Sequence, residues 1–264
     1  MMPTPIYTKE SLIAKLREIK AMGWIESGRH GNVGGVGNTI EDLLGIEENN
    51  LPIPNAAEWE LKCQRLNTSS LTTLFHMEPS PTALKFVPSI LLPKYGWAHK
   101  EAGKKHPENE RSFRQTISAL SRSDRGFKVV VDRIAEKVLV SFDASTVADK
   151  HRGWLNSVKK NVGLLELDPQ PYWGFQDLFH KAGTKLHNCF FVGAEVKKVD
   201  GKEFFLYSKI MKLSAFSIDR FITTIEIGDT LVDFDARTGH NHGTKFRFRN
   251  SRLHELYENI EEIA

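Results

Sequence analysis

Residues 54–63 read Pro-Asn-Ala-Ala-Glu-Trp-Glu-Leu-Lys-Cys. Side chains alternate between the two faces of a β-strand, and here apolar residues alternate with polar ones. One face carries the apolar side chains Trp59, Leu61 and Cys63. The other face carries the carboxylate of Glu60 and the ammonium of Lys62, followed by Gln64. The pattern predicts a strand near residues 58–65 with its polar pair on an exposed face.

A carboxylate beside an ammonium is what metal-assisted hydrolysis of a phosphodiester requires. The carboxylate would hold Mg2+, which prefers oxygen ligands and keeps several of its waters, and the lysine would orient or activate the attacking water. The same Glu-x-Lys spacing also occurs at residues 18–20 and 195–197, so spacing alone does not identify a catalytic pair. A surface ion pair worth well under ~1 kcal/mol is the alternative for each of the three.

The surroundings of Glu60 separate its pair from the other two. Residues 18–20 lie on a predicted helix, where side chains two positions apart diverge. Residues 195–197 lie on a predicted strand and are the stronger competitor. Only Glu60 has, five positions earlier, a polar residue that follows a proline, Asn55, and a further acid upstream on a short predicted helix, Glu41. This layout resembles the PD-(D/E)xK nuclease motif.

The order of the motifs along the chain is more specific than any one of them. The matching segments are 31–44 (GNVGGVGNTIEDLL), 47–51 (EENNL), 54–62, 70–75, Tyr172-Trp173, Glu195, Val232-Asp233 and 242–247 (HGTKFR). Through them the sequence resembles the MvaI/BcnI restriction endonucleases, which are relatives of the mismatch-repair nickase MutH. The resemblance implies an α/β PD-(D/E)xK fold, in which a mixed sheet is flanked by helices. It also implies a single nuclease domain over residues 1–264, with a MutH-like catalytic lobe and a DNA-recognition lobe around a DNA cleft.

The resemblance implies an active site formed by Glu41, Asn55, Glu60 and Lys62. The ligands of a Mg2+ cofactor would be Asn55, Glu60 and Leu61, the last through its backbone. The family carries aspartate where this chain has Asn55, so a negative charge is missing. One unit charge at ~4 Å is worth roughly 4 kcal/mol at an effective dielectric of ~20, so its loss weakens metal binding and slows cleavage. Two interpretations stay open: a deliberately inactivated form, which we favour, or a homologue that works with a poorer site.

Side chains able to contact DNA bases gather on two strands predicted at residues 231–236 and 244–248. They are Asp233, Asp235, Arg237, His240, His242, Lys245, Arg247 and Arg249. Arginine reads guanine O6 and N7, and aspartate accepts from cytosine N4, so such a ribbon suits G·C pairs in the major groove. From composition alone a salt-bridged hairpin is the stronger interpretation. The resemblance reverses this, since Asp233 and Arg247 match base-contacting residues of the family, although Asp235 replaces an arginine found in one member.

His76 follows a strand predicted at residues 71–75 and is the candidate for contacting the central base pair. Members of the family recognise CC(A/T)GG or CC(C/G)GG, which differ at that pair. A neutral imidazole both donates and accepts, so it could bond guanine N7 from either orientation of a central G·C pair. We therefore expect a CC(C/G)GG-like site; a buried or helix-capping histidine is the alternative.

Two other patterns are set aside. His240-Asn241-His242 spells HNH, but that nuclease class is defined by residues spread through a ββα-metal unit, and no nearby cysteine or third histidine completes a zinc site. The glycine-rich residues 31–37 follow no clear strand and lack the Gly-Lys-Ser/Thr ending of a nucleotide-binding loop. A loop that approaches DNA phosphates, or a plain turn, suits them better.

Composition is that of a globular protein. With 264 residues, 40% of them hydrophobic and 26% charged, the chain is long enough for one substantial core. No window approaches the ~18 consecutive apolar residues of a membrane span, and no signal peptide is expected. The two cysteines form no disulfide or metal pattern, so we expect a reducing cytoplasm. The net charge is only +3, but basic residues cluster at 94–125 and 245–252, where they could follow a phosphate backbone or coat solvated loops.

The hydrophobic periodicity predicts the remaining elements. Helices are expected at residues 8–22, from about 39 to 44, at 172–186 and 217–227, and from 251 onward. Paired strands are expected at 127–131 with 137–142, at 189–197 with 203–209 around an Asp200-Gly201 turn, and at 231–236 with 244–248. Residues 94–112 are expected to form a long basic loop.

Together these observations predict a Mg2+-dependent type II restriction endonuclease that cuts double-stranded DNA. The resemblance implies a monomer with one active site that nicks the two strands in turn, by in-line attack of water on the scissile phosphate. A cognate DNA methyltransferase is expected in the same host. A MutH-like repair nickase and a non-cleaving sequence-specific DNA-binding protein are the alternatives, the second because of Asn55.

Overall fold

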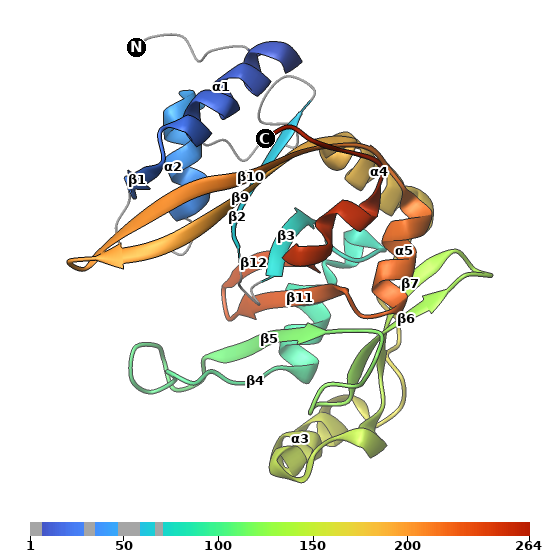
Figure 1. Ribbon diagram of the computed structural model, residues 1–264. Helices are drawn as coiled ribbons and strands as arrows, with labels where there is room; N and C mark the ends of the chain where they lie inside the picture. Colours follow the sequence, from blue (N-terminus) through green and yellow to red (C-terminus); the bar gives the residue numbers. More distant parts are fainter. Residues whose placement is uncertain (1–6, 29–34, 47–58, 67–70) are drawn as a thin grey trace. The chain divides into compact units, whose positions relative to one another are not determined.

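A computed structural model describes residues 7–28, 35–46, 59–66 and 71–264 (Figure 1). It has the mixed α/β character that the sequence predicts. The chain divides into two compact units, each assembled from separate stretches of sequence. Unit 1 comprises Met1–Thr72, Ala182–Ser217 and Arg249–Ala264, and unit 2 comprises Thr73–Lys181 and Ile218–Phe248.

Unit 1 is built on a five-stranded sheet with the order β1-β10-β9-β2, in which β13 also pairs with β10. Its elements are α1 (Lys9–Ala21), β1 (Trp24–Glu26), α2 (Gly35–Leu44), β2 (Glu60–Arg65), β9 (Asn188–Val199), β10 (Lys202–Phe216), the 3-10 helix η5 (Asn250–Leu256) and β13 (Tyr257–Glu262). β2 runs parallel to β9, whereas the other pairs are antiparallel. A parallel pair needs a long crossover connection, and the segment between these two strands, which includes much of unit 2, supplies it.

Local sequence signals set the start of α1 and the turn between β9 and β10. The hydroxyl of Thr8 accepts a hydrogen bond from the Ser11 N–H at 3.2 Å, and the Ser11 hydroxyl accepts one from the Thr8 N–H at 2.9 Å, which caps the start of α1. The hairpin between β9 and β10 turns at Asp200 and Gly201, which both have positive φ, as a two-residue type I′ turn requires. The predicted N-terminal helix and this hairpin are therefore confirmed.

The two helices α1 and α2 pack on one face of the sheet of unit 1. The buried positions of α1 recur at helical spacing and are Leu12, Leu16 and Ile19. They share one hydrophobic cluster with residues of α2 and of three strands, among them Val36, Ile40, Leu61, Phe190, Val192, Phe205 and Tyr207. Figure 1 shows α1 and α2 beside β9 and β10. The face of β2 that carries Leu61 is therefore the core face, as its alternation predicts.

Unit 2 contains a five-stranded sheet with the order β3-β12-β11-β5-β4 and a three-stranded sheet with the order β6-β7-β8. The strands are β3 (Leu71–His76), β4 (Trp97–Ala98), β5 (Arg111–Ile117), β6 (Phe127–Asp132), β7 (Lys137–Phe142), β8 (Tyr172–Gly174), β11 (Thr230–Arg237) and β12 (His240–Arg249). The helices are η1 (Thr82–Leu84), the π-helix η2 (Val87–Tyr95), η3 (Ala144–Thr146), η4 (Asp149–His151), α3 (Arg152–Val162) and α5 (Ile218–Glu226), whereas α4 (Phe175–Leu186) begins in unit 2 and its residues from Ala182 belong to unit 1. The two strand pairs predicted here, β6 with β7 and β11 with β12, are confirmed.

Aromatic side chains form the core of unit 2. The ring of Phe113 on β5 lies 5.4 Å from that of Phe127 on β6 and 5.3 Å from that of Phe234 on β11. On the neighbouring strands, Phe75 stacks on Phe246 with ring centroids 5.1 Å apart. All five rings are almost fully buried, so the inward-facing positions of β5, β11 and β12 are fixed by packing.

The structure corrects four of the predicted boundaries. The helix expected from about residue 39 begins at Gly35, inside the glycine-rich stretch. Residues 172–174 form β8 instead of a helical turn, because pairing with β7 buries Trp173. Residues 250–256 form a 3-10 helix, and the chain then pairs with β10 as β13 instead of continuing as a helix. The expected basic loop contains the end of η2, the short strand β4 and the first residues of β5. In the last three cases a partner distant in the sequence decides the local structure.

Among the described helices, none combines the length and the apolar character that crossing a lipid bilayer would require.

Candidate functional site

The polar pair predicted on β2 is in contact and buried. Lys62 Nζ lies 2.6 Å from Glu60 Oε1, and the two side chains are 14% and 2% exposed. In the parallel register with β9, Glu60 lies beside Cys189 and Lys62 beside Phe191, and both partners are buried. The expectation of an exposed polar face is wrong for Glu60, because β9 lies between two strands and is buried on both of its faces at this level.

The structure also describes the two competing Glu-x-Lys segments, residues 18–20 and 195–197, and in neither does the glutamate pair with the lysine. On α1, Glu18 forms an ion pair with Lys15 at 2.9 Å, three residues away. On β9, Glu195 is exposed, and Lys197 places its Nζ 4.3 Å from the centre of the Trp24 ring. Of the three segments, the one on β2 has the paired and buried geometry.

The pKa values of two cysteine thiols depend on the charges around β2. Burial raises the pKa of Cys189 to about 12. The positive charge of Lys62 lowers this pKa, and the negative charge of Glu60 raises it. Burial also raises the pKa of Cys63, and the negative charge of Glu41 adds to the increase. Glu41 lies on α2, which packs on β2. Glu60 and Lys62 therefore lie together on β2, Glu41 lies on the neighbouring helix α2, and Asn55 lies outside the described residues.

The oxygen atoms at this position suit a hard cation. The Leu66 N–H donates to the Ala194 carbonyl at 2.7 Å and continues the pairing of β2 with β9. The N–H and carbonyl of one strand residue point to the same side, and this side alternates from residue to residue. Leu61 is five positions before Leu66, so its carbonyl points away from β9, to the side of β2 that pairs with no described strand. A carboxylate and a backbone carbonyl are ligands that Mg2+ accepts while it keeps several waters. Within the described ranges, no group of three or more His, Cys, Asp or Glu side chains could hold a metal ion.

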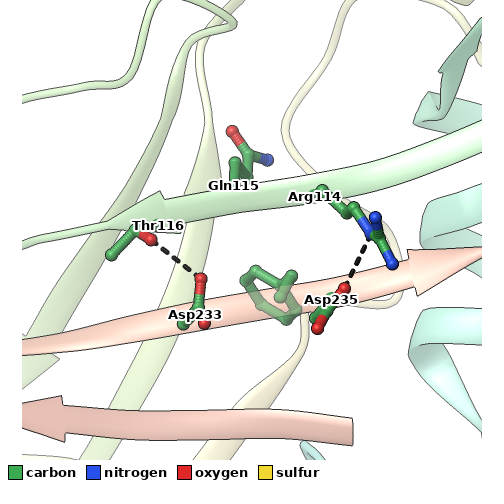
Figure 2. Close-up of a pocket in the computed structure, with 6 residues that line it drawn as sticks. Arg114, Gln115, Thr116, Asp233 and Asp235 are labelled. Atoms are coloured by element: carbon green, nitrogen blue, oxygen red, sulfur yellow. Dashed lines mark hydrogen bonds and ion pairs between the residues drawn. The ribbon is translucent and has the colours of Figure 1, made fainter. Parts of the chain in front are cut away.

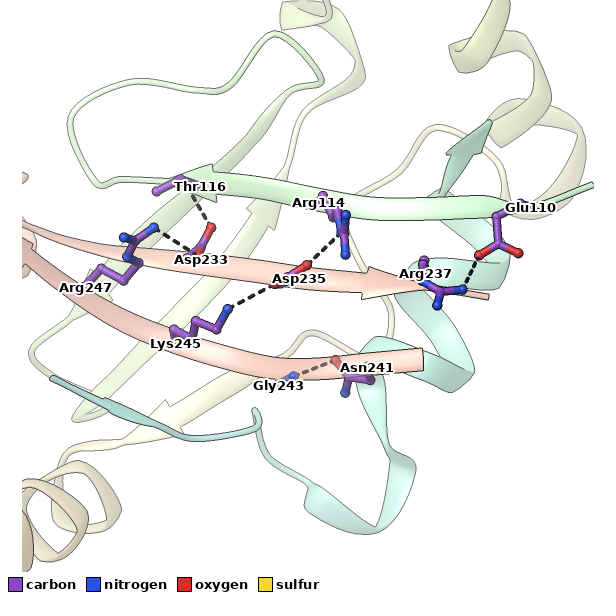
Figure 3. Close-up of polar contacts among 10 residues, drawn as sticks. All are labelled: Glu110, Arg114, Thr116, Asp233, Asp235, Arg237, Asn241, Gly243, Lys245 and Arg247. Carbon is purple, nitrogen blue, oxygen red and sulfur yellow. Dashed lines mark hydrogen bonds and ion pairs between the residues drawn. The ribbon is translucent and has the colours of Figure 1, made fainter. Parts of the chain in front are cut away.

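A second candidate region lies on unit 2, where β5, β11 and β12 share a polar face (Figure 3). Along β11, buried residues alternate with half-buried ones, so the face opposite the aromatic core is free to carry charge. We call this surface the charged face; its residues are Glu110, Arg114, Thr116, Asp233, Asp235, Arg237, Lys245 and Arg247. It contains five of the eight residues predicted to bind DNA on these strands and β3, together with three residues from β5 and its preceding loop.

Asp235 lies at the centre of the charged face. Its carboxylate pairs with Arg114 Nε at 2.7 Å and with Lys245 Nζ at 3.0 Å, so that strands β5 and β12 both reach it from β11. Burial raises the pKa of Asp235, but the hydrogen bond from Lys245 and the positive charges of Lys245 and Arg114 outweigh it and leave the pKa below its usual value. Figure 2 shows the surface pocket beside this cluster, about 350 Å³ in volume, which Arg114, Thr116, Asp233 and Asp235 help to line.

The remaining charges of this face are also paired. Asp233 accepts a hydrogen bond from the Thr116 hydroxyl at 2.8 Å and lies 3.5 Å from Arg247 Nη1. Arg237 pairs with Glu110 at 3.0 Å. Four cations therefore meet three carboxylates, which leaves one positive charge on the face. This is the salt-bridged arrangement that composition alone predicts, and such pairing also holds each guanidinium in a defined orientation.

Glu78, in the loop after β3, stabilises a β-bulge in β12. Its carboxylate accepts hydrogen bonds from the Thr244 N–H at 2.9 Å, the Thr244 hydroxyl at 3.2 Å and the Asn241 amide at 3.3 Å. The register between β11 and β12 shifts at this point, and Gly243 has a φ of +83°. A Cβ on Gly243 would lie 3.4 Å from the His76 ring, so the bulge and the end of β3 are close neighbours.

The three histidines predicted to contact DNA are all exposed. His76 is the last residue of β3, so the alternative of a buried histidine is wrong, and no described helix begins at it. His240 and His242 lie at the start of β12 with ring centres 4.2 Å apart. All three therefore lie near the bulge that Glu78 holds.

Arg114 and Glu78 are residues that the sequence did not single out. Arg114 belonged to a basic cluster that could equally coat a solvated loop. The alternation of Arg114 and Thr116 with Phe113 and Ile117 is a strand signal that could have found β5. No local signal shows that β5 pairs with β11, more than a hundred residues later.

Comparisons with known proteins agree on one family. A model of the MvaI/BcnI restriction endonuclease family matches residues 13–257. Among solved structures, the chain is similar to "Restriction endonuclease MvaI-cognate DNA substrate complex", with a TM-score of 0.75 and 24% identity. It is also similar to "Restriction endonuclease MvaI in the absence of DNA", with a TM-score of 0.56 and 24% identity. Both alignments cover 98% of this chain and 100% of the other, and they confirm the predicted fold. A search among curated proteins found no match.

Proposed function

The chain belongs to the MvaI/BcnI restriction endonuclease family, and from this premise we propose that it cleaves double-stranded DNA at a short G·C-rich site with the help of Mg2+. The observation that carries the proposal is the buried Glu60–Lys62 pair on β2, in a chain that matches the family over residues 13–257. The structural neighbour described as a complex with cognate DNA supports duplex DNA as the substrate.

Glu41, Asn55, Glu60 and Lys62 are proposed to form the active site. Asn55, Glu60 and the Leu61 carbonyl would hold Mg2+, which supplies positive charge at the scissile phosphate. Lys62 keeps its ammonium 2.6 Å from Glu60, so it is in place to orient the attacking water. Glu41, on α2, would add a further carboxylate. The reaction is in-line attack of water on the phosphate, which leaves 5′-phosphate and 3′-hydroxyl ends.

With asparagine at position 55, the chain is proposed to be a catalytically impaired enzyme. An amide oxygen can still face Mg2+, but the negative charge of an aspartate is absent. At an effective dielectric of ~20, one unit charge at ~4 Å contributes roughly 4 kcal/mol, which corresponds to about a thousand-fold in binding or rate. Whether the asparagine is an introduced change or the natural residue, Asn55→Asp should restore the missing charge.

The site that the enzyme recognises is proposed to be CC(C/G)GG-like. The residues proposed to contact DNA are His76, Asp233, Asp235, Arg237, His240, His242, Lys245 and Arg247. The carboxylates of the charged face suit cytosine N4, and its guanidinium groups suit guanine O6 and N7. The exposed position of His76 supports its proposed contact with the central base pair.

The test is digestion of plasmid DNA in Mg2+ by the protein as it stands and by its Asn55→Asp variant, with the ends sequenced. We expect the variant to cut at CC(C/G)GG sites and the unchanged protein to cut far more slowly. In the Asn55→Asp background, Lys62→Met should abolish cleavage. Lys197→Met is the matched control, because Lys197 belongs to a Glu-x-Lys segment on β9 but contacts the Trp24 ring instead of Glu195. This change should leave cleavage unchanged.

Other outcomes distinguish the alternatives. Single-strand nicks that never become double-strand breaks would favour a MutH-like nickase. Sequence-specific binding without any cleavage after Asn55→Asp would favour a non-cleaving DNA-binding protein. Cleavage of oligonucleotides that vary only in the central pair tests the role of His76, and a preference for A·T there contradicts it.

We further propose that the enzyme acts as a monomer that nicks the two strands in turn. Sedimentation of the protein on a single-site duplex should give one protein chain per DNA. A methyltransferase that modifies the same site is the proposed partner in the host, because a restriction nuclease would otherwise cut the host genome.

A further inference from the structure

Arg114 is a partly exposed arginine whose position is set by an ion pair. Its Nε lies 2.7 Å from Asp235 Oδ1, and its side chain is 38% exposed on the charged face. Asp235 is itself held by Lys245 at 3.0 Å from the opposite strand, so the carboxylate that orients Arg114 is fixed from both sides. Among the residues that the structure describes, Asp235 is the side chain that the Arg114 guanidinium pairs with.

This arrangement leaves the two terminal amino groups of the guanidinium with their hydrogen-bond donors available. Figure 2 shows Arg114 beside the pocket of about 350 Å³ that Thr116, Asp233 and Asp235 also line. A planar guanidinium whose Nε is paired with a carboxylate, on a side chain that is 38% exposed, suits the O6 and N7 acceptors of guanine. The other arginines of the face, Arg237 and Arg247, use a terminal amino group in their own ion pairs.

We propose that Arg114, which β5 contributes, is a specificity-determining residue that reads one guanine of the target site, and that Asp235 is the positioning residue that orients it. The inference rests on the proposed function, because it assumes that the charged face meets the bases of a specific duplex. It extends that function from the two strands that the sequence indicated to a third.

A phosphate contact is the competing role for an exposed arginine, and the anchoring argues against it. A phosphate can be met by a flexible cation such as lysine, and the contact carries no sequence information. An arginine that is pinned through Nε by a carboxylate loses rotational freedom and part of its net charge, both of which weaken a simple electrostatic contact. The same pinning improves the geometric discrimination between bases.

The first step of the test is independent of Arg114. The unchanged protein, without Mg2+, selects from a pool of duplexes with a randomised segment, and we expect a G·C-rich consensus. Failure to select any consensus overturns the proposed function and this inference with it.

The second step compares Arg114→Ala and Arg114→Lys with the unchanged protein on duplexes in which each consensus base pair is replaced singly. We expect both variants to lose discrimination at one G·C pair, by roughly 5- to 150-fold for the alanine variant, and to keep the preferences at the other positions. Arg133→Lys is the matched control, since Arg133 also donates through Nε to a carboxylate, that of Glu226 at 2.7 Å, but on the β6–β7 hairpin. It should keep every preference.

Two results would overturn the role of Arg114 while the proposed function stands. A uniform loss of affinity across all duplexes, with a salt dependence reduced by about one charge, identifies a phosphate contact. Preferences identical to those of Arg133→Lys identify a structural ion pair. Asp235→Asn tests the positioning role: because Asp235 is also proposed to contact DNA, its loss of discrimination at the pair that Arg114 reads should be smaller in an Arg114→Ala background than in the unchanged protein, and losses that simply add contradict the positioning role. Retained non-specific binding at low salt shows that each variant is folded.

Discussion

Replacing Lys62 by methionine removes the positive partner of Glu60 and leaves the carboxylate buried. The two charged atoms lie 2.6 Å apart, and the Glu60 side chain is only 2% exposed. At an effective dielectric of ~20, the attraction between unit charges at this distance is about 6 kcal/mol. In the methionine variant no ammonium has to be desolvated on folding, and the removal of that cost offsets part of the lost attraction.

Removal of one partner of a buried ion pair costs about 3–5 kcal/mol in stability. Lys62 keeps 14% of its side chain exposed, so we expect Lys62→Met to lie at the lower end of that range, about 3 kcal/mol. Glu60→Gln should cost less, since the flexible lysine that remains can move its ammonium towards water. The double variant Glu60→Gln/Lys62→Met buries no unpaired charge, so its stability should return to within about 1 kcal/mol of the unchanged protein.

The assay is urea unfolding of the three variants, followed by circular dichroism at neutral pH. Lys15→Met is the matched control, because Lys15 also forms a Lys–Glu pair in unit 1, with Glu18 at 2.9 Å, but at the surface. It should leave the unfolding midpoint unchanged. If the double variant is as unstable as the two single changes added together, or if Lys62→Met unfolds like the unchanged protein, Lys62 does not compensate the buried charge of Glu60.

Three further predictions concern other groups. Glu78→Ala removes the acceptor of the part-buried Thr244 N–H and should cost roughly 2 kcal/mol in urea unfolding, whereas a loss equally large in Glu78→Gln, which keeps an acceptor oxygen, would contradict this origin. The folded-state pKa of Asp235 lies below its usual value, so its stabilising contribution is present above the unfolded pKa of about 3.9 and is lost as the pH falls through the folded pKa. Asp235→Asn should therefore lower the melting temperature at pH 7 but not near pH 2, and a deficit that persists in acid would refute the assignment. Burial and a pKa of about 12 should keep Cys189 unmodified by iodoacetamide at pH 8 until urea is added, and rapid labelling of the folded protein at this thiol would contradict its burial.

Sequence was sufficient wherever the signal is local or periodic. The alternation around Glu60 identified β2 and separated its core face from its polar face, since the side-chain period of a strand is two. Asp200-Gly201 predicted the hairpin between β9 and β10, because few residues tolerate positive φ at both positions of a tight turn. The order of short motifs indicated the family, which the match over residues 13–257 confirms.

Tertiary structure decided what depends on partners far away in the chain. Glu60 is buried because β9, which follows more than a hundred residues later, lies beside β2 and is covered on both faces. Residues 257–262 extend as a strand because β10 offers hydrogen bonds to that segment. Arg114 meets Asp235 only because β5 pairs with β11 across an equally long separation. Periodicity records which face of an element is apolar, but it contains no information on which other element covers that face, and burial and ion pairing both follow from that choice.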